Sequence, residues 1–359
     1  MQTRTLKLTQ FDPQNLAVED RELHEFRLIM GGHIFFQAMS AACQLDLFTW
    51  LSRNPGKPAA AIQKALGLPQ HQCRVLLMSL CTLNLIKKNP RGLFRNATLS
   101  ERLLSRDSED NVLSVMAAQN FIAYKAMFHL TDALKAGKNV GIKEFPGNGD
   151  TLYKRLAKDR KLEKMFHDWM HTISSQANPQ LASLPELKKV RHLMDIGGGD
   201  GTNTMALQQA HPHLKLTMFD FPTVAKIAAK NFKKNKMDIN AVPGDMLKDP
   251  FPIGADEILF SHIINIFDAE KNVMLLRKAY QALPKGGMTI IFNSMIENDE
   301  TGPLRGAELG LYFVTLASGE GMMYAYKDFA AWLRQAGFRK IVTYRMNDWT
   351  NHGAVIGIK

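Results

Sequence analysis

A glycine-rich run provides the first chemistry that this sequence could support. Residues 193–201 read LMDIGGGDG, with Asp195, Gly197, Gly199 and Gly201 at every second position. Glycines are needed where the backbone turns with positive φ and where a ligand approaches the main chain closely. Because an apolar run precedes them and a helical pattern follows, we expect a strand-to-helix turn that faces a nucleoside. The dinucleotide pattern G-x-G-x-x-G fails, since Thr202 stands where its last glycine would be.

Acidic residues after the next two apolar runs could complete a nucleoside site. Asp220 closes the run LKLTMFD, where the second strand of such a fold presents a carboxylate to a ribose diol. Asp245 and Met246 follow the third run and could offer a carboxylate to an adenine amine and an apolar face to its ring. Either acid alone could be a solvated strand end, but in this order they predict S-adenosylmethionine as the cofactor. The predicted binding residues are Asp195, Gly197, Gly199, Gly201, Asp220, Phe221, Asp245 and Met246.

The elements that would position these residues alternate between strand and helix. The apolar runs from His192 onward read HLMDIGG, LKLTMFD, INAVPGD, DEILFSHI and MTIIFNS. Helices are predicted at Thr202–Ala210, Thr223–Asn235, Ala269–Leu283, Arg305–Ala317 and Lys327–Ala336, and final strands at Lys340–Arg345 and Ala354–Ile358. This alternation is typical of βαβ units. We therefore predict an α/β fold with a Rossmann-like catalytic domain at residues 181–359, built on a seven-stranded, mostly parallel sheet.

The amino-terminal third has a helical pattern instead. The predicted elements are helices at Leu23–Leu51, Ala59–Leu66 and Gln70–Leu85, and hairpin strands at Ile86–Lys88 and Leu93–Asn96. Helices followed by a hairpin outline a winged-helix domain, expected at residues 1–110. A helical linker with substrate-pocket helices is expected at 111–180, and the boundary to the catalytic domain near Asn178–Pro185, where two prolines flank a polar segment.

Composition limits the class of protein. The 359 residues include 45 Lys plus Arg against 34 Asp plus Glu, a net charge of +11, and 45 % are apolar. This proportion of apolar and charged residues argues against an intrinsically disordered chain. The longest apolar stretch, Gly32–Leu51, is too polar to span a membrane. The opening MQTRTLKLTQ has no apolar core, so no export signal is expected. Cys43, Cys73 and Cys81 lack metal-ligand spacing and suit free thiols in the cytoplasm, with no metal site.

The positive charge alone would suit a nucleic-acid partner. However, the basic residues between Lys135 and Lys164 alternate with acids at helical spacing, and few aromatic residues lie among them. The helix Gln70–Leu85, which would read DNA in a winged helix, carries only Arg74 as an early cation. We therefore expect neither a nucleic-acid nor a membrane partner; a winged-helix nucleic-acid-binding protein is the alternative from another functional class.

The chain resembles the S-adenosylmethionine-dependent small-molecule O-methyltransferases, the family of plant phenolic and bacterial secondary-metabolite enzymes. The matching runs are LMDIGGGDG, HPHLKLTMFDFPTV at 211–224, PGDMLKDPFP at 243–252, LPKGG at 283–287, AWLRQAGF at 331–338 and NATLSERLL at 96–104. The resemblance implies that the first domain is a winged-helix dimerisation domain. It also implies that Asp220 binds ribose and that Asp245 and Met246 bind adenine. Ser261 would stand where plant members often have a lysine near the methionine carboxylate.

The histidine base usual in that family is missing. Members carry it after the fourth strand to deprotonate the acceptor hydroxyl, because a phenol with a pKa of ~10 is mostly neutral at pH 7. The stretch SHIINIFDAEKN aligns Asn265 with this base, and Asn293 aligns with the acid that orients it. An amide cannot take the proton. His262 lies three residues earlier and would point elsewhere if its strand continued straight.

Three interpretations of this loss stay open. First, the acceptor could need no protein base, if it is an acidic hydroxyl, a thiolate, an amine or an activated carbon. Second, the family fold could bind the cofactor but catalyse a non-methylating reaction. Third, another residue could serve as the base. The other residues considered are His129, His167, His171, Asp268 and His352. We predict an S-adenosylmethionine-dependent methyltransferase of a small aromatic or secondary metabolite, by O- or C-methyl transfer. Its candidate catalytic residues are Asn265, His262 and Asn293.

Apolar side chains predict where the acceptor binds. The predicted pocket residues are Phe121, Tyr124, Phe166, Trp169, Met170, Phe313 and Met323, although helix packing would produce a similar list. The segment Gly32–Leu51 has too many apolar positions for a face half open to water. We therefore expect a homodimer that forms through the first ~100 residues.

Overall fold

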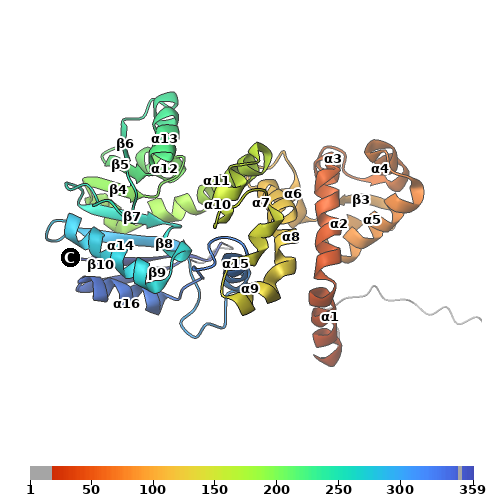
Figure 1. Cartoon of the computed structure of the whole chain (residues 1–359). Coiled ribbons are helices and arrows are strands. Elements are labelled where there is room, and N and C mark those ends of the chain that lie inside the picture. The colour runs from red at the N-terminus through yellow and green to blue at the C-terminus, as the bar shows by residue number, and fades with distance from the viewer. Residues whose placement is uncertain (1–17, 347–349) are drawn as a thin grey trace, which may run out of the picture. The chain divides into compact units, whose positions relative to one another are not determined.

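The computed structural model describes residues 18–346 and 350–359, which form two compact units divided after Asn120 (Figure 1). The opening run MQTRTLKLTQ lies outside the described residues, so the expectation about an export signal stays a prediction. In the described part of the chain, no helix is long and apolar enough to cross a membrane. The same residues contain no group of three or more His, Cys, Asp or Glu side chains that could hold a metal ion.

The first unit is helical with a small antiparallel sheet. Its helices are α1 Val18–Met30, α2 Gly32–Gln44, α3 Leu47–Arg53, α4 Ala59–Leu66, α5 Gln70–Thr82, α6 Thr98–Leu104 and α7 Leu113–Ala118. Its strands β1 Lys57–Pro58, β2 Ile86–Lys88 and β3 Leu93–Asn96 pair in the order β1-β3-β2. The predicted hairpin is therefore confirmed. Cys73, Leu77 and Leu80 bury one side of α5, so this helix packs into the core of the unit.

A continuous helix over Leu23–Leu51 is wrong, because the chain turns at two points. Gly31 separates α1 from α2, and Asp46 adopts a left-handed conformation with φ of 57° between α2 and α3. The Thr49 hydroxyl donates to Asp46 Oδ1 at 2.7 Å and stabilises this turn. Periodicity did not show the break because apolar residues recur on both sides of it.

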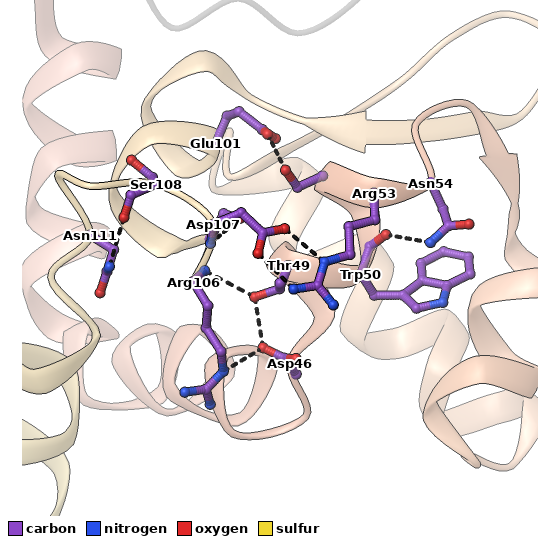
Figure 2. Close-up of polar contacts among 12 residues, drawn as sticks. Asp46, Thr49, Trp50, Arg53, Asn54, Glu101, Arg106, Asp107, Ser108 and Asn111 are labelled. Carbon is purple, nitrogen blue, oxygen red and sulfur yellow. Dashed lines mark hydrogen bonds and ion pairs between the residues drawn. The ribbon is translucent and has the colours of Figure 1, made fainter.

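Charged side chains fasten α3 to the segment that follows α6 (Figure 2). Arg53 donates to both carboxylate oxygens of Asp107, at 2.7 and 2.6 Å. Arg106 donates from Nε to Asp46 at 2.9 Å, and its backbone N–H donates to the Thr49 hydroxyl at 3.1 Å. Because these charges are largely exposed, water and salt screen the ion pairs, which serve mainly to fix the path of the chain.

The second unit holds a seven-stranded sheet. Its strands are β4 His192–Ile196, β5 Lys215–Asp220, β6 Ile239–Pro243, β7 Glu257–Ser261, β8 Met288–Ser294, β9 Lys340–Arg345 and β10 His352–Ile358. They pair in the order β6-β5-β4-β7-β8-β10-β9, and only β10 runs against its neighbours. The predicted mostly parallel, Rossmann-like sheet is confirmed.

Helices cover both faces of this sheet (Figure 1). The helices of the whole second unit are α8 Tyr124–Ala126, α9 Leu130–Ala136, α10 Leu152–Leu156, α11 Arg160–Ala182, α12 Thr202–Ala210, α13 Pro222–Lys234, α14 Ala269–Ala282, α15 Leu304–Thr315 and α16 Tyr326–Ala336. α14 and α16 pack on one face. The end of α11, together with α12 and α13, packs on the other. Alternate side chains of each strand fill the two cores, as the period of two requires.

The polar segment expected around Pro179 is helical. α11 continues through Pro179 to Ala182, because Ala177 and Leu181 are buried against the sheet and anchor its last turn. Packing therefore overrides the usual helix-ending effect of proline. The division between the two compact units lies between Asn120 and Phe121, and the predicted domain bounds stay a prediction.

Glu257 is a buried acid in the middle of the sheet. Its side chain is fully buried, neither carboxylate oxygen has a hydrogen-bond partner among the described residues, and burial raises its pKa well above the ordinary 4.5. The charges of Asp256 and Glu186 raise it further. Because the folded state keeps a proton that the unfolded state has lost, this group makes stability fall as the pH rises above 4.5.

We expect Glu257→Gln to remove this pH dependence. Within the window between 4.5 and the raised pKa, the free energy of unfolding of the parent protein should fall by about 1.4 kcal/mol per pH unit relative to the variant. Urea denaturation at pH 5, 6, 7 and 8 measures this difference. The exposed Glu270→Gln is the control and should follow the parent protein. If the free energies of unfolding of Glu257→Gln and of the parent protein change in parallel with pH, Glu257 is ionised in the folded state and the prediction is wrong.

Candidate active site

The glycine run forms the turn between β4 and α12. Gly197, Gly199 and Gly201 all have positive φ, at 73°, 62° and 88°. A Cβ on Gly201 would lie 2.3 Å from the Phe232 ring, whereas a Cβ on Gly199 would meet no atom within 4 Å. The missing side chain of Gly201 therefore lets the turn pack against α13. The missing side chain of Gly199 leaves open space beside the backbone, where a ligand can approach.

Asp220 ends β5 directly beside this turn. Its Oδ2 accepts from the Gly199 N–H at 3.0 Å, and its Oδ1 accepts from the Phe221 N–H at 2.7 Å. Burial raises the pKa of Asp220, and these two N–H donors oppose the rise by stabilising the carboxylate. The turn and the acid thus form one unit, as the sequence predicted. Phe221 is 47 % exposed and could cover a bound nucleoside.

Asp195 lies beneath the turn. Its Oδ2 accepts from the Thr204 hydroxyl at 2.8 Å, and its Oδ1 is buried with no partner in the described structure. Burial raises its pKa to about 7, and the charge of Asp220 adds to the rise. The acid therefore supports the loop from inside. Its predicted contact with the cofactor stays a prediction.

Asp245 and Met246 follow β6 at the same edge of the sheet. Asp245 Oδ1 accepts from the Leu247 N–H at 2.9 Å, which fixes the turn. Met246 is 8 % exposed, and its methyl carbon would lie 3.0 Å from a Cβ on Gly197. The apolar residue and the glycine turn are therefore neighbours, as an adenine-binding wall requires.

Asn203 is a site residue that the sequence reasoning missed. It lies in the first turn of α12, and its Nδ2 donates to the Ser261 hydroxyl at 2.8 Å. Its Oδ1 is buried and has no partner among the described residues. This pair of polar side chains occupies the place where the family resemblance put a lysine. The position of Asn203, two residues after the last glycine, was the available signal.

His262 does not continue the straight line of β7. Its φ is 60°, a left-handed conformation that turns the chain immediately after the strand. Nε2 of His262 lies 2.7 Å from Nε2 of His352, and Nδ1 of His352 lies 2.6 Å from the Thr350 hydroxyl. The strand therefore does not continue straight through His262, and the condition under which this side chain would point elsewhere is not met. Burial lowers the pKa of His262 to about 4.

Asn265, which the sequence aligns with the family's base, is a buried amide. Its Nδ2 donates to the Ser294 carbonyl at 3.0 Å and to the Met323 sulfur at 3.3 Å. Its Oδ1 has no partner among the described residues. Asn293 is 1 % exposed on β8, with an Nδ2 that is likewise unpartnered. Among the described residues, no hydrogen bond joins the two amides.

Aromatic side chains gather between α10, α11 and α15. Trp169 packs edge-on against Phe166 at 5.7 Å and against Tyr312 at 5.4 Å. Tyr312 in turn contacts Phe313, which brings three predicted pocket residues together. The predicted Met323 lies beside Asn265 instead, and Phe121 is 43 % exposed. Tyr124 and Met170 are partly buried, and their part in a pocket stays a prediction.

The other histidines considered as bases lie in ordinary contacts. His129 lies 2.7 Å from Glu144, and His171 lies 3.0 Å from the Thr202 hydroxyl. The His167 ring packs on Phe166. None of these contacts reaches the histidine pair of His262 and His352.

The arrangement matches known proteins over nearly the whole chain. Residues 127–339 match the O-methyltransferase domain model, and residues 28–106 match the O-methyltransferase dimerisation domain model. The chain is 34 % identical to an L-tyrosine C(3)-methyltransferase of Streptomyces lavendulae, over 92 % of this chain and 91 % of that protein. It is 26 % identical to a 3-hydroxy-5-methyl-1-naphthoate 3-O-methyltransferase of Streptomyces sahachiroi, over 90 % and 91 %. The apo crystal structure of the S-adenosylmethionine-dependent methyltransferase SibL superposes with a TM-score of 0.86 at 34 % identity, over 94 % and 99 % of the two chains.

We expect Asp220→Ala to weaken binding of S-adenosylmethionine and of its demethylated product. Loss of one charge-assisted hydrogen bond to the ribose costs ~1.5–3 kcal/mol, which is about a tenfold to hundredfold rise in Kd. Isothermal titration calorimetry measures the change, and NAD, which should not bind, is the ligand control. The exposed Asp238→Ala is the protein control. Unchanged affinity in Asp220→Ala would remove Asp220 from the cofactor site.

Proposed function

Because the chain belongs to the O-methyltransferase family of S-adenosylmethionine-dependent small-molecule enzymes, we propose that it methylates a ring carbon next to the hydroxyl of a tyrosine-like phenol. The cofactor supplies an electrophilic methyl group. The glycine turn, Asp220, Met246, Asn203 and Ser261 would hold it, since they offer open backbone, a carboxylate, an apolar wall and polar side chains along one edge of the sheet.

The observation that carries this proposal is the buried amide of Asn265. A base at this position would activate an acceptor oxygen, whereas the amide can only accept a hydrogen bond from a hydroxyl through its unpartnered Oδ1. A phenol held in this way keeps its proton, so its oxygen stays a poor nucleophile. The electron-rich ring carbon beside the hydroxyl is then the better acceptor of the methyl group.

The aromatic cluster supports a flat acceptor. Phe166, Trp169 and Tyr312 offer ring surface, and the Trp169 N–H is buried without a partner among the described residues. A buried donor of this kind gains a hydrogen bond when a ligand oxygen reaches it. The relative from Streptomyces lavendulae, named for methylation of tyrosine at carbon 3, supports the same acceptor class.

Incubation with L-tyrosine and methyl-13C-labelled S-adenosylmethionine tests the proposal. Ring methylation gives an aromatic methyl carbon signal by NMR, which is well separated from the methoxy signal of an O-methyl product. A methoxy product would overturn carbon transfer, and labelled cofactor that binds without transfer to tyrosine would overturn this acceptor. Demethylated cofactor without any methylated product would point to a non-methylating reaction.

We expect Asn265→Ala to retain kcat within about tenfold, since no proton transfer worth ~10²–10⁴-fold is removed. The KM for L-tyrosine should rise, because the hydrogen bond to the phenol hydroxyl is lost. Steady-state kinetics of ring methylation measure both values, with the exposed Asn240→Ala as control. Loss of turnover with cofactor binding intact would instead assign the amide a role in the transition state.

We also infer that the protein acts as a homodimer in the cytoplasm. An apolar face is exposed on α1 and α2, made by Leu23, Phe26, Ile29, Met30 and Ile34, which are 50, 59, 79, 62 and 61 % exposed. A contiguous patch of this kind usually marks an interface, and the matching dimerisation model covers it from residue 28. The three cysteines are free thiols, which fits a reducing compartment.

We expect the double substitution Phe26→Asp and Ile29→Asp to separate the dimer. Two carboxylates in a symmetric apolar interface would meet their own copies, so repulsion and desolvation oppose association. Light scattering after size exclusion should change from twice the 40.4 kDa chain mass to a single chain. The control Ile253→Asp, at a residue that is 85 % exposed in the second unit, should stay dimeric. A parent protein that is monomeric at micromolar concentration would contradict the inference.

A further inference from the structure

One lysine side chain fastens the segment after β6 to helix α14. Lys278 lies on α14, is partly buried, and donates from Nζ to the carbonyl oxygen of Met246 at 2.5 Å. The same Nζ lies 4.7 Å from the centroid of the Phe251 ring. A single ammonium group therefore holds this segment at two points that are five residues apart.

The residues around Met246 close a turn on themselves. The Asp245 N–H donates to Asp249 Oδ2 at 2.8 Å, and the Asp249 N–H donates back to the Asp245 carbonyl at 2.8 Å. Asp245 Oδ1 accepts from the Leu247 N–H at 2.9 Å. The Met246 carbonyl accepts from Lys278 instead, so the hydrogen bond from α14 fixes the middle of the turn relative to the sheet.

Both groups that Lys278 touches lead to the cofactor site. The Met246 side chain packs against the glycine turn. The Phe251 ring packs edge-on against Phe219 at 5.7 Å, and Phe219 directly precedes Asp220 on β5. A shift of the Lys278 contacts would therefore be felt at the apolar wall and next to the acid that ends β5.

Two acids balance the charge of Lys278. Burial lowers the pKa of Lys278, and the charges of Asp245 and Asp249 oppose this effect, which favours the ammonium form. Lys248 also lies near Asp245, at 3.5 Å, but its side chain is 82 % exposed. Because water screens an exposed charge, the partly buried Lys278 is the cation that interacts more strongly with this turn.

We propose that Lys278 is a positioning residue that makes the cofactor site selective for an adenine base, an inference that rests on the cofactor site of the proposed function. Lys278 holds the Met246 carbonyl, and the turn that contains it keeps the Asp245 carboxylate in place to accept from the 6-amino group of adenine. A base without this amino group would leave the carboxylate unpaired. Lys278 acts through Met246 and Asp245 and has no part in methyl transfer itself.

Lys278→Met is the first test, because methionine has a similar length but neither donates a hydrogen bond nor carries a charge. The ligands are S-adenosylhomocysteine and its analogue in which purine, without the 6-amino group, replaces adenine. Isothermal titration calorimetry of the parent protein should give a Kd about tenfold to hundredfold lower for the adenine ligand, the size of one charge-assisted hydrogen bond. In Lys278→Met this ratio should fall towards one, because the carboxylate is no longer held in place.

The ratio of the two Kd values separates positioning from packing. Merely loosened packing would weaken both ligands by the same factor. A parent-like ratio in Lys278→Met would therefore overturn the role of Lys278, even if both Kd values rise. Arg277→Met removes a positive charge from the exposed neighbouring position of the same helix, and this control should keep the parent ratio.

Two further variants test the chemistry of the side chain. Lys278→Arg keeps a cation and N–H donors and should restore most of the selectivity. A ratio as low as that of Lys278→Met would overturn the role of the donated hydrogen bond and the charge. If Lys278→Met does not fold, Lys278→Gln replaces it, since glutamine keeps an N–H donor for the Met246 carbonyl but carries no charge. Its ratio should also fall below that of the parent protein, and a parent-like ratio would overturn the proposal.

None of these measurements needs a methyl acceptor. Equal affinity of the parent protein for the two ligands would overturn the placement of adenine beside Asp245, and this inference with it. Absence of ring-methylated tyrosine would instead overturn the proposed acceptor and would not change either Kd. The failure of the proposed function and the failure of this inference are therefore distinguishable.

Discussion

The parallel alignment of β5, β4, β7 and β8 is the constraint on which the rest of the site depends. Parallel strands end at one edge, so the residues that follow them meet there although they are far apart in the chain. The glycine turn, Asp220 and the histidine pair all lie at this edge. β10 runs against its neighbours, and its first residue, His352, therefore reaches the same edge from the opposite direction. Reversal of a single strand thus supplies the partner of His262.

Several buried polar atoms at this edge have no partner among the described residues. Asp195, Asn203 and Asn265 each bury an oxygen that has no hydrogen-bond partner in the described part of the chain. Each such atom destabilises a folded protein by ~1–3 kcal/mol unless a ligand or water reaches it. A fold that needed only stability would place apolar side chains here. We expect cofactor and acceptor to offset this cost when they bind, which would couple binding to the stability of the edge.

Sequence patterns predicted the elements of the sheet and the glycine turn because both depend on local residue types. The period of two identified the strands, and the positive φ at Gly197, Gly199 and Gly201 required the residue that was found there. Contacts across long sequence separations could not be predicted. The pairing of His262 with His352 spans 90 residues and depends on strand order. The helical course through Pro179 likewise depends on burial against the sheet and has no local signal.

The sequence predicts that Asn265 and Asn293 stand where the family has a base and its orienting acid, and electrostatics explains why both positions would be amides. Asn293 is 1 % exposed, so an acid there would be a buried carboxylate that needs a cationic or hydrogen-bonding partner. Removal of one partner from a buried charge pair costs ~3–5 kcal/mol, because the other charge is left uncompensated. A chain that exchanged the histidine at 265 for an amide would therefore gain stability by neutralising 293 as well. The histidine pair obeys the same rule. The imidazoles of His262 and His352 are joined by one N–H···N hydrogen bond, so both rings can be neutral and the pair packs without burying a charge.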